Sequence, residues 1–324
     1  MNLATAHDVI AAQALLADRL PATPLIFSPA LSAASGATVW LKCECFAAVG
    51  SFKARGALNC LLRLDAATLA GGLICASTGN HGAAMAWAAT SLGAHCTVVV
   101  PHNTPAIKLT NMRNAGATVI IDGGDWGESC TIARQMATES GWLYLEDGED
   151  PYIMAGAGTV AREVLQQLPQ VEDLLVPVGG GNFIAGCALA TKADQHPHLR
   201  LLGVQSEAAP AVTESMRLGQ MVHRPTTSFA GGIATTTPVP QAFAIMQRYV
   251  DDMLLVSEAE LRAAVALLVQ QHAMIVEGAG VAPVAALLRY PERFVGRTVV
   301  LVLSGRNLDV SELLQAVQAA PAAS

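Results

Sequence analysis

Charged and aromatic residues are scarce in this sequence, and their scarcity excludes several classes of protein. Only 14% of the 324 residues are charged and 5% are aromatic, whereas 52% are hydrophobic. Charges, glycines or prolines nevertheless interrupt every apolar run before it reaches the length of a membrane span. Residues 1–20 include Asp8 and Asp18 and have no basic segment ahead of an apolar one, which excludes a secretory signal. We therefore expect a protein that neither crosses a membrane nor is secreted.

Clusters of basic residues are also lacking. The formal net charge is −7, which argues against nucleic acid or an acidic membrane surface as a partner. The seven cysteines are odd in number and scattered, mostly inside apolar runs, which indicates free thiols in a reducing cytoplasm. Cys43 and Cys45 have no second Cys/His pair at zinc-site spacing, so we expect no structural metal there.

The sequence does have a regular alternation of strand-like and helix-like segments. The strand-like segments are continuous runs of valine, leucine and isoleucine, typical of parallel strands that are buried on both faces. This pattern predicts an α/β fold with two doubly wound, mostly parallel sheets and a cleft between them. The expected strands are residues 38–43, 72–76, 96–100, 118–121, 142–145, 173–178, 201–205 and 297–303, and the expected helices are residues 54–64, 82–92, 105–115, 128–140, 156–168, 183–192, 258–272 and 279–288.

A glycine loop, residues 179–182, follows one expected strand and precedes a helix. Its sequence is Gly179-Gly180-Gly181-Asn182. Successive glycines let several backbone N–H groups point at one phosphate, assisted by the helix dipole. A dinucleotide-binding fingerprint fails on spacing, because Ile184 stands where glycine or alanine is needed. We favour an anion site over an ordinary strand-to-helix turn.

Two further polar turns follow expected strands. The serine turn, residues 77–81, reads Ser77-Thr78-Gly79-Asn80-His81 and can offer hydroxyls, an amide and N–H groups to a carboxylate, although a simple helix cap explains it equally well. Ser304 ends another strand, at the sheet edge where ligands usually bind in open α/β folds. Ser304 is not a nucleophile elbow, because Val302 stands where the first glycine belongs.

Lys53 lies in a turn of small residues before the expected helix 54–64. A helix N-terminus carries partial positive charge, which disfavours a second positive charge and favours the neutral amine. A neutral, positioned amine is what Schiff-base chemistry requires. Taken alone, a surface lysine at a helix start is the commoner case, so the rest of the chain decides between the two.

Together these four segments resemble the fold-type II pyridoxal-phosphate-dependent enzymes, in particular the serine/threonine dehydratase and serine racemase branch. The likeness extends over nearly the whole chain and includes Thr23-Pro24-Leu25, residues 155–159 and Glu277-Gly278-Ala279-Gly280. It implies a fold like that of the tryptophan synthase β-subunit, with pyridoxal 5′-phosphate in the cleft. The cleft would lie between a large cofactor-binding domain, residues 1–65 and 150–324, and a small mobile substrate-binding domain, residues 71–149. The resemblance also implies a homodimer.

The resemblance assigns a role to each motif. Lys53 would form the Schiff base with the cofactor, and Phe52 and Gly232 would lie against opposite faces of its ring. Asn80 would hydrogen-bond to the 3′ oxygen of the ring, and Ser304 would face the pyridine nitrogen. Backbone N–H groups of Gly179, Gly180, Gly181 and Asn182 would hold the phosphate. The substrate carboxylate would be bound by Ser77, Thr78, Gly79, Asn80 and His81.

The reaction implied is β-elimination from a β-hydroxy amino acid, with L-threonine or L-serine as the default substrate. Lys53, once freed, would take the α-proton as a general base, hydroxide would leave the β-carbon, and a 2-oxo acid and ammonia would result. A hydroxyl at Ser304 does not keep the pyridine nitrogen protonated as a carboxylate would, which favours elimination over transamination.

Five residues depart from the family pattern. Thr78 stands where the racemases have a serine as second acid/base, which weakens racemisation without excluding it. Gln205 stands where many relatives have an acidic cation ligand, and Ala211 where a further aspartate is expected, so we expect no metal site of the family type. Arg306 could alter substrate choice or point to solvent. Trp126 could line a pocket for a larger β-substituent or serve in packing.

Three alternatives to a dehydratase of L-threonine or L-serine stay open. The chain could be an amino-acid racemase with Thr78 as the second base. It could be a dehydratase for a bulkier substrate of the hydroxyaspartate or phenylserine type. It could also be a non-catalytic cofactor carrier, although retention of Lys53 speaks against this, because phosphate binding does not need a lysine amine.

Overall fold

Two β-sheets organise the molecule, as a computed structural model of the chain shows; it describes residues 3–146, 148, 150–193, 196 and 198–319. Within them, every strand pairing is parallel except that of β1 with β2. The six-stranded sheet has the order β1 (Leu25–Phe27), β2 (Thr38–Lys42), β10 (Thr298–Val302), β7 (Asp173–Pro177), β8 (Arg200–Ser206) and β9 (Asp252–Val256). The four-stranded sheet has the order β5 (Thr118–Ile121), β4 (Cys96–Val100), β3 (Leu73–Ala76) and β6 (Leu143–Tyr144). The predicted α/β fold with two mostly parallel sheets is confirmed.

Helices cover both faces of the larger sheet, because its strands are apolar on both faces. Successive residues of the central strand β10 point to opposite sides. Val299 and Leu301 join one core with residues of α12 and α13, whereas Val300 and Val302 join another core with residues of α8 and α9. The helices are α1 (Ala6–Leu16), α2 (Pro29–Ser35), α3 (Lys53–Leu61), α4 (Ala66–Gly71), α5 (Asn80–Ser91), α6 (Ala106–Asn114), α7 (Trp126–Ser140), α8 (Pro151–Gln167), α9 (Asn182–Thr191), α10 (Ala211–Leu218), α11 (Pro240–Tyr249), α12 (Glu258–His272), α13 (Ala282–Arg289) and α14 (Val310–Ala319), with short 3₁₀ turns η1 (Glu44–Phe46), η2 (Ala48–Gly50) and η3 (Pro291–Arg293).

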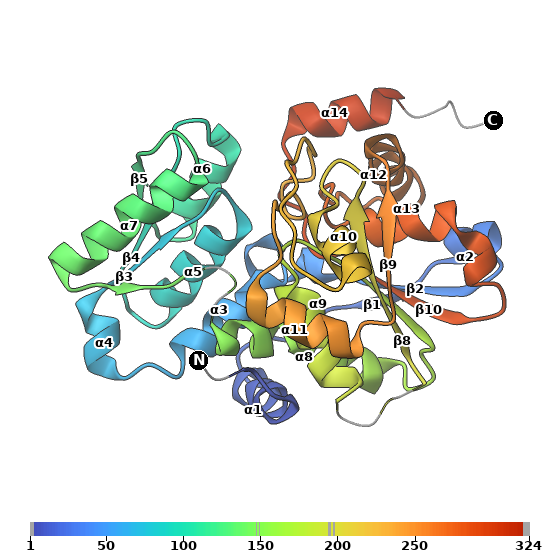
Figure 1. The fold of residues 1–324 in the computed structure, drawn as a ribbon, viewed down its shortest axis with the longest axis horizontal. Coiled ribbons are helices and arrows are strands. Elements are labelled where there is room, and N and C mark those ends of the chain that lie inside the picture. The colour runs from blue at the N-terminus through green and yellow to red at the C-terminus, as the bar shows by residue number, and fades with distance from the viewer. Residues whose placement is uncertain (1–2, 147, 149, 194–195, 197, 320–324) are drawn as a thin grey trace.

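The four-stranded sheet and its helices α4 to α7 form a small lobe, and the six-stranded sheet with the remaining helices forms a large lobe (Figure 1). Helix α3 joins them, because it packs against α5 of the small lobe and α8 of the large lobe. Glycines allow the approach of α3 to α8: a Cβ atom on Gly56 would lie 2.7 Å from the Ile153 carbonyl oxygen, and one on Gly156 would lie 2.6 Å from the Arg55 carbonyl oxygen. No helix in the described residues is long and apolar enough to cross a membrane.

Several helices begin earlier than the sequence pattern predicts, because capping residues extend them. Helix α8 begins at Pro151 rather than at residue 156, since the Asp150 carboxylate accepts hydrogen bonds from the N–H groups of Tyr152 and Ile153. Helix α7 begins at Trp126 rather than at residue 128, because Asp125 accepts a hydrogen bond from the Glu128 N–H. Short elements such as α2, α10 and β9 lacked a long enough periodic signal to be expected.

Candidate active site

Lys53 is the first residue of α3 and lies beside the carboxyl end of β10. The Phe52 N–H donates to the Ser304 carbonyl oxygen at 3.1 Å, and Ser51 forms an isolated β-bridge with Gly305. These contacts join two sequence motifs that lie some 250 residues apart in the chain. The helix begins one residue before the expected start, at Lys53 itself. The lysine is half-buried, and its Nζ lies 5.5 Å from the centre of the Phe52 ring.

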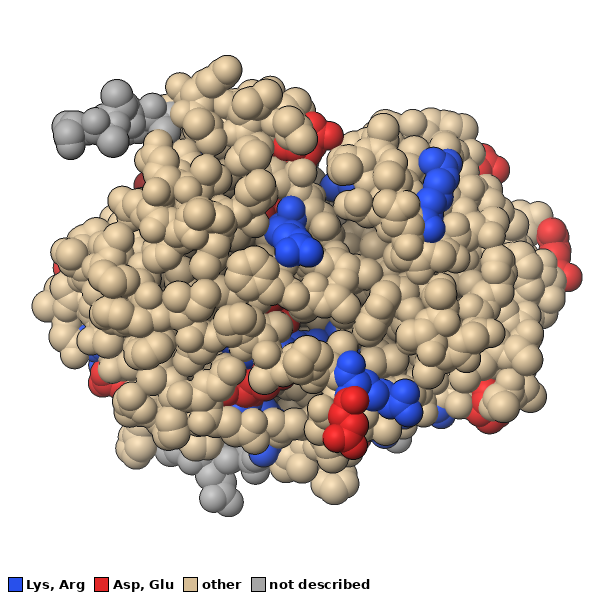
Figure 2. All heavy atoms as spheres, turned by 180° about the vertical axis from the view of Figure 1, so that it is seen from behind, with Lys and Arg blue, Asp and Glu red and all other residues tan. Residues whose placement is uncertain are grey.

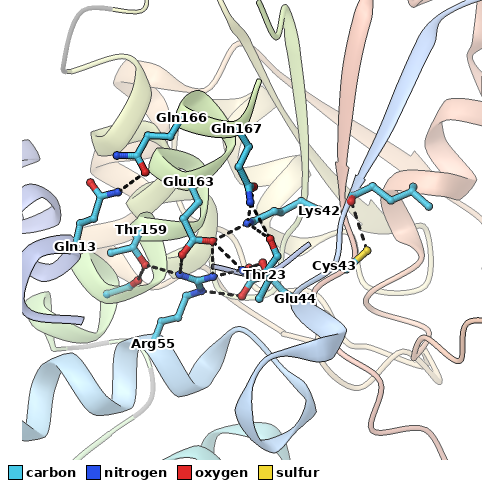
Figure 3. Close-up of polar contacts among 12 residues, drawn as sticks. Gln13, Thr23, Lys42, Cys43, Glu44, Arg55, Thr159, Glu163, Gln166 and Gln167 are labelled. Carbon is cyan, nitrogen blue, oxygen red and sulfur yellow. Dashed lines mark hydrogen bonds and ion pairs between the residues drawn. The ribbon is translucent and has the colours of Figure 1, made fainter. Parts of the chain in front are cut away.

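A buried ionic network holds the first turn of α3 in place (Figure 3). The Arg55 guanidinium donates to Glu44 from Nε at 2.8 Å and from Nη2 at 2.9 Å, and to Glu163 from Nη1 at 2.6 Å and Nη2 at 2.8 Å. Lys42 donates to Glu163 at 2.6 Å, and Thr23 donates to Glu44 at 2.5 Å. Burial raises the cost of each charge, but two cations and two carboxylates balance and nearly every polar atom has a partner.

The network also shifts the pKa values of Glu163 and Lys42. Arg55 and Lys42 hold the pKa of Glu163 below its ordinary value, although burial alone would raise it. Burial lowers the pKa of Lys42, and the carboxylates of Glu44 and Glu163 oppose that shift. Because Arg55 is two residues beyond Lys53 on the same helix, the network fixes the backbone from which the Lys53 side chain projects.

Asn80 lies between a carboxylate and a second amide, which together set its orientation. Its Nδ2 donates to Glu277 Oε1 at 2.7 Å, and its Oδ1 accepts from Asn307 Nδ2 at 2.7 Å. Asn307 also donates to the Val49 carbonyl oxygen at 2.9 Å, just before Lys53 in the chain. Burial raises the pKa of Glu277 to about 7, opposed by the hydrogen bond from Asn80 and by the positive charges of Lys108 and Lys53. One N–H of the Asn80 amide remains to donate elsewhere.

The glycine loop leads into α9 and contains buried polar atoms without partners. Among the described residues, neither Nδ2 nor Oδ1 of Asn182 has a hydrogen-bond partner, and the same holds for Oγ1 of nearby Thr235. The loop is closely surrounded: a Cβ on Gly179 would lie 2.9 Å from the Gly232 carbonyl oxygen, and one on Gly181, whose φ is 105°, would lie 2.6 Å from Met246 Sδ. Buried polar groups rarely stay unpaired in a working protein. Donors of this kind at a helix N-terminus fit a phosphate group.

The serine turn is partly occupied by its own hydrogen bonds. Ser77 Oγ accepts from the Gly79 N–H at 3.2 Å and from the Gly82 N–H at 2.9 Å, so these two donors are not available to a ligand. Thr78 is exposed, whereas Ser77 and His81 are buried. Helix α5 begins at Asn80, two residues before the expected start, which places the first-turn N–H groups of the helix inside the turn.

Three further residues singled out from the sequence, Phe52, Ser304 and Arg306, differ in their burial and contacts. Phe52 stacks on Phe183 with ring centres 3.8 Å apart, and Ser304 is 5% exposed. Arg306 is exposed and lines an open cavity of about 420 Å³ beside Trp87 and Asn307. Over the face shown in Figure 2 charged side chains are sparse, and the surface is hollowed between the two lobes.

Two of the residues that depart from the family pattern have local roles. Gln205 is buried, and its Oε1 accepts from the backbone N–H and the hydroxyl of Thr213 at 2.8 and 3.0 Å. Trp126 is 45% exposed at the start of α7, which places its ring at the surface rather than in a core. Neither position contributes to the group of residues around Lys53.

The sequence gives no indication of the local role of four residues of the site. Glu277 and Asn307 orient Asn80, Thr235 lies at the glycine loop, and Lys108 approaches the serine turn. Glu277 lies in a segment that carried the family resemblance, but nothing in the sequence tied its carboxylate to Asn80. The two are 197 residues apart, and only the packing of the lobes joins them.

Comparison with known proteins agrees with this geometry. Residues 17–305 match the family described as pyridoxal-phosphate dependent enzyme. The chain is 40% identical to the L-threonine ammonia-lyase of Geobacter sulfurreducens over 94% of this chain and 75% of that protein. It is 36% identical to the L-threo-3-hydroxyaspartate ammonia-lyase of a Pseudomonas species, over 96% of this chain and 98% of that one. The structure of the processed form of threonine deaminase isoform 2 from Solanum lycopersicum superposes with a TM-score of 0.91 and 31% identity, covering 97% of this chain and 92% of that one. The chain belongs to the pyridoxal-phosphate-dependent enzymes.

Proposed function

We propose that this protein is an ammonia-lyase that dehydrates and deaminates a β-hydroxy amino acid, with L-threonine or L-serine as the default substrate, to a 2-oxo acid and ammonia. The observation that carries the proposal is the meeting of Lys53, Asn80 and Ser304 at the junction of the two lobes. The Phe52–Ser304 and Asn307–Asn80 hydrogen bonds bring together the ends of β3, β10 and the start of α3. The similarity to an L-threonine ammonia-lyase supports the choice of reaction.

Each residue around the site has a proposed task. Pyridoxal phosphate, when bound, withdraws electrons from the α-carbon of an attached amino acid and so makes its proton removable. Lys53 anchors the cofactor and carries that proton on its amine. The glycine loop, Gly179, Gly180, Gly181 and Asn182, holds the phosphate, and the unpaired amide of Asn182 fits this task. Asn80 donates its remaining N–H to the ring oxygen, and Glu277 and Asn307 keep the amide in that orientation.

The remaining groups position the ring and the substrate. Phe52 and Gly232 would flank the ring of the bound cofactor, and the Ser304 hydroxyl would face its nitrogen without supplying a negative charge to keep that nitrogen protonated. The serine turn, Ser77, Thr78, Gly79, Asn80 and His81, binds the substrate carboxylate. Thr78 is exposed on this turn, and its hydroxyl is the candidate for a second acid/base. Gln205 already bonds to Thr213, so a metal ligand at that position is not part of the proposal.

A second candidate substrate is a 3-hydroxyaspartate. The chain covers nearly the whole of the Pseudomonas L-threo-3-hydroxyaspartate ammonia-lyase and is 36% identical to it. A larger β-substituent such as that of phenylserine, and racemisation through Thr78, are the other outcomes to be tested. A non-catalytic carrier is the least supported alternative, because Lys53 is retained.

The proposal includes how the chain is divided and where it works. We assign residues 1–65 and 150–324 to the cofactor-binding domain and residues 71–149 to a small mobile substrate-binding domain. All strands of the four-stranded sheet fall within the second range, which supports the division. A homodimer is expected from the family resemblance. The seven cysteines are all free and buried, which supports a reducing, cytoplasmic setting.

A substrate panel tests this function. The holoenzyme is incubated with L-threonine, L-serine, L-threo-3-hydroxyaspartate and phenylserine, and the 2-oxo acid and ammonia released are measured. Turnover of at least one substrate, lost in Lys53→Ala, is expected. Racemised serine without 2-oxo acid would replace the lyase by a racemase, and no reaction with any of the four would refute the proposal. Dependence on magnesium after EDTA treatment would contradict the expectation that no metal is needed.

A further inference from the structure

Lys108 projects from α6 of the small lobe into the space between the two lobes. Its Nζ lies 3.7 Å from the position that a Cβ atom of Gly79 would occupy, and 3.5 Å from the corresponding position at Gly231. Gly79 is the middle residue of the serine turn, and Gly231 precedes Gly232 in the large lobe. The ammonium therefore fills the space that two missing side chains leave open. It lies beside the proposed substrate turn on one side and beside the opposite lobe on the other.

No anion pairs directly with the Lys108 ammonium within the described part of the chain. The side chain is half-buried, yet it makes neither a hydrogen bond nor an ion pair with a described residue. Lys42 and Lys192, by contrast, pair with Glu163 and Asp251. A half-buried ammonium without an anion has lost part of its hydration and gained no partner, which favours binding of an anionic ligand at this point.

The carboxyls of Glu277 and Glu312, on which the charge of Lys108 acts, belong to other elements and are themselves poor partners. Lys108 lowers the pKa of Glu277 and of Glu312, but burial outweighs it and raises the pKa of both. Glu277 already accepts its hydrogen bond from Asn80. Asp309 and Arg262 act on Glu312 in opposite directions. Raised pKa values disfavour the charged forms of both carboxyls, which makes them weaker partners for the Lys108 ammonium than ordinary carboxylates would be.

We propose that Lys108 binds the α-carboxylate of the amino-acid substrate, together with the serine turn. This rests on the proposed function, because it is that reaction which brings an amino acid to the turn. The turn itself supplies neutral donors, and Ser77 Oγ already accepts from the N–H of Gly79 in the turn and from the N–H of Gly82 just after it. A charge-assisted hydrogen bond is about twice as strong as one between neutral groups, so the ammonium is the strongest donor at this position.

The position of Lys108 would also place the bound substrate carboxylate between the two lobes. Because α6 belongs to the small lobe and Gly231 to the large lobe, an anion bound at Lys108 Nζ is held at the junction of both. Every α-amino acid substrate carries this carboxylate, whatever its side chain. Lys108 therefore acts on all substrates alike and does not select among β-substituents.

The test compares two amines that differ only in the group Lys108 is proposed to bind. L-Alanine has an α-carboxylate and no β-hydroxyl, and L-alaninamide has a neutral amide in place of the carboxylate. Binding of each to the holoenzyme is followed by the change in cofactor absorbance. Lys108→Met removes the charge and keeps most of the side chain, Lys108→Arg keeps the charge, and Arg113→Met removes one charge from an exposed position on the same helix.

Lys108→Met should weaken L-alanine binding roughly ten-fold, the usual range for loss of a hydrogen bond to a charged group, and leave L-alaninamide binding unchanged. Lys108→Arg should retain most of the affinity for L-alanine, and Arg113→Met all of it. In turnover, Lys108→Met should raise KM for L-threonine and L-threo-3-hydroxyaspartate by the same factor.

Three results would overturn the proposal. Equal loss of alanine and alaninamide binding would show that Lys108 acts through Glu277 or the fold rather than on the carboxylate. Unchanged binding of both would show that it does not contact the ligand. A KM effect confined to L-threo-3-hydroxyaspartate would assign Lys108 to the side-chain carboxylate instead. The binding arm needs no turnover, so a wild-type protein that fails on every β-hydroxy amino acid refutes the proposed function and still leaves the Lys108 proposal to be decided by alanine and alaninamide.

Discussion

Replacing Arg55 by methionine should destabilise the protein strongly, because it removes one partner from a buried ionic network. The Arg55 side chain is 3% exposed and that of Glu44 is fully buried. The substitution deletes four hydrogen bonds to Glu44 and Glu163 and a fifth to Thr159. Among the described residues, the Glu44 carboxylate would keep only its hydrogen bond from Thr23, and it would lose the cation that contacts it. Breaking a buried pair from one side costs about 3–5 kcal/mol.

A matched surface pair provides the control. Arg293 donates to Asp252 at 2.8 Å, but the two side chains are 33% and 46% exposed. Water and salt replace such a contact, so Arg293→Met should cost less than about 1 kcal/mol. The double variant Glu44→Gln with Arg55→Met removes the uncompensated charge and keeps an acceptor for Thr23. It should therefore be more stable than Arg55→Met alone.

Urea unfolding of the holoenzyme, followed by circular dichroism, measures these differences. Arg55→Met should also bind the cofactor more weakly, since it loosens the first turn of α3, where Lys53 begins the helix. Equal losses for Arg55→Met and Arg293→Met would refute the reasoning, because they would mean that the buried network contributes no more than an exposed pair. A double variant no more stable than Arg55→Met would show that the unpaired charge of Glu44 is not what destabilises it.

The other predictions concern the group around Asn80. A Cβ atom on Gly305 would overlap Glu277 Oε1, so Gly305→Ala should displace the Glu277 carboxylate and release the Asn80 amide from its hydrogen bond. The variant should therefore bind the cofactor more weakly, which equilibrium dialysis measures. An unchanged cofactor affinity would contradict this prediction. Burial raises the pKa of Glu277 in the folded protein to about 7 from an ordinary 4.5. Protonation of Glu277 therefore stabilises the fold fully below pH 4.5, and this stabilisation is lost as the pH rises through about 7. Glu277→Gln should therefore gain about 2 kcal/mol relative to wild type between about pH 5 and about pH 8, measured by urea unfolding; a pH-independent difference would refute the assignment.

Much of the architecture could be predicted from the sequence because its signals are local. Parallel strands buried on both faces read as continuous apolar runs, and β4, β5 and α12 have the predicted limits. The three glycines before α9 and the polar turn before α5 also announce themselves within a few residues. Helix starts were less certain, since a single capping side chain such as Asp150 or Asp125 moves the boundary by several residues.

The contacts that orient the site could not be predicted, because they join distant parts of the chain. Arg55 and Glu163 are 108 residues apart, and Asn80 and Asn307 are 227 apart. No periodicity links such pairs, and only the packing of α3 against α8 and of the small lobe against the large lobe brings them together. Lys108 gave no signal either, since a lone lysine on a polar helix is usually a solvated side chain.

The chain has four lysines, and the proposed function requires that Lys53 alone carries the cofactor. Lys42 is buried in the ionic network, Lys192 pairs with Asp251, and Lys108 is proposed to bind the substrate. Reduction of the holoenzyme with borohydride would fix the cofactor covalently to its lysine, and peptide mass spectrometry would locate it. We expect the added mass on the peptide that contains Lys53. A label on the peptide of Lys42, Lys108 or Lys192, or on none of the four, would contradict it.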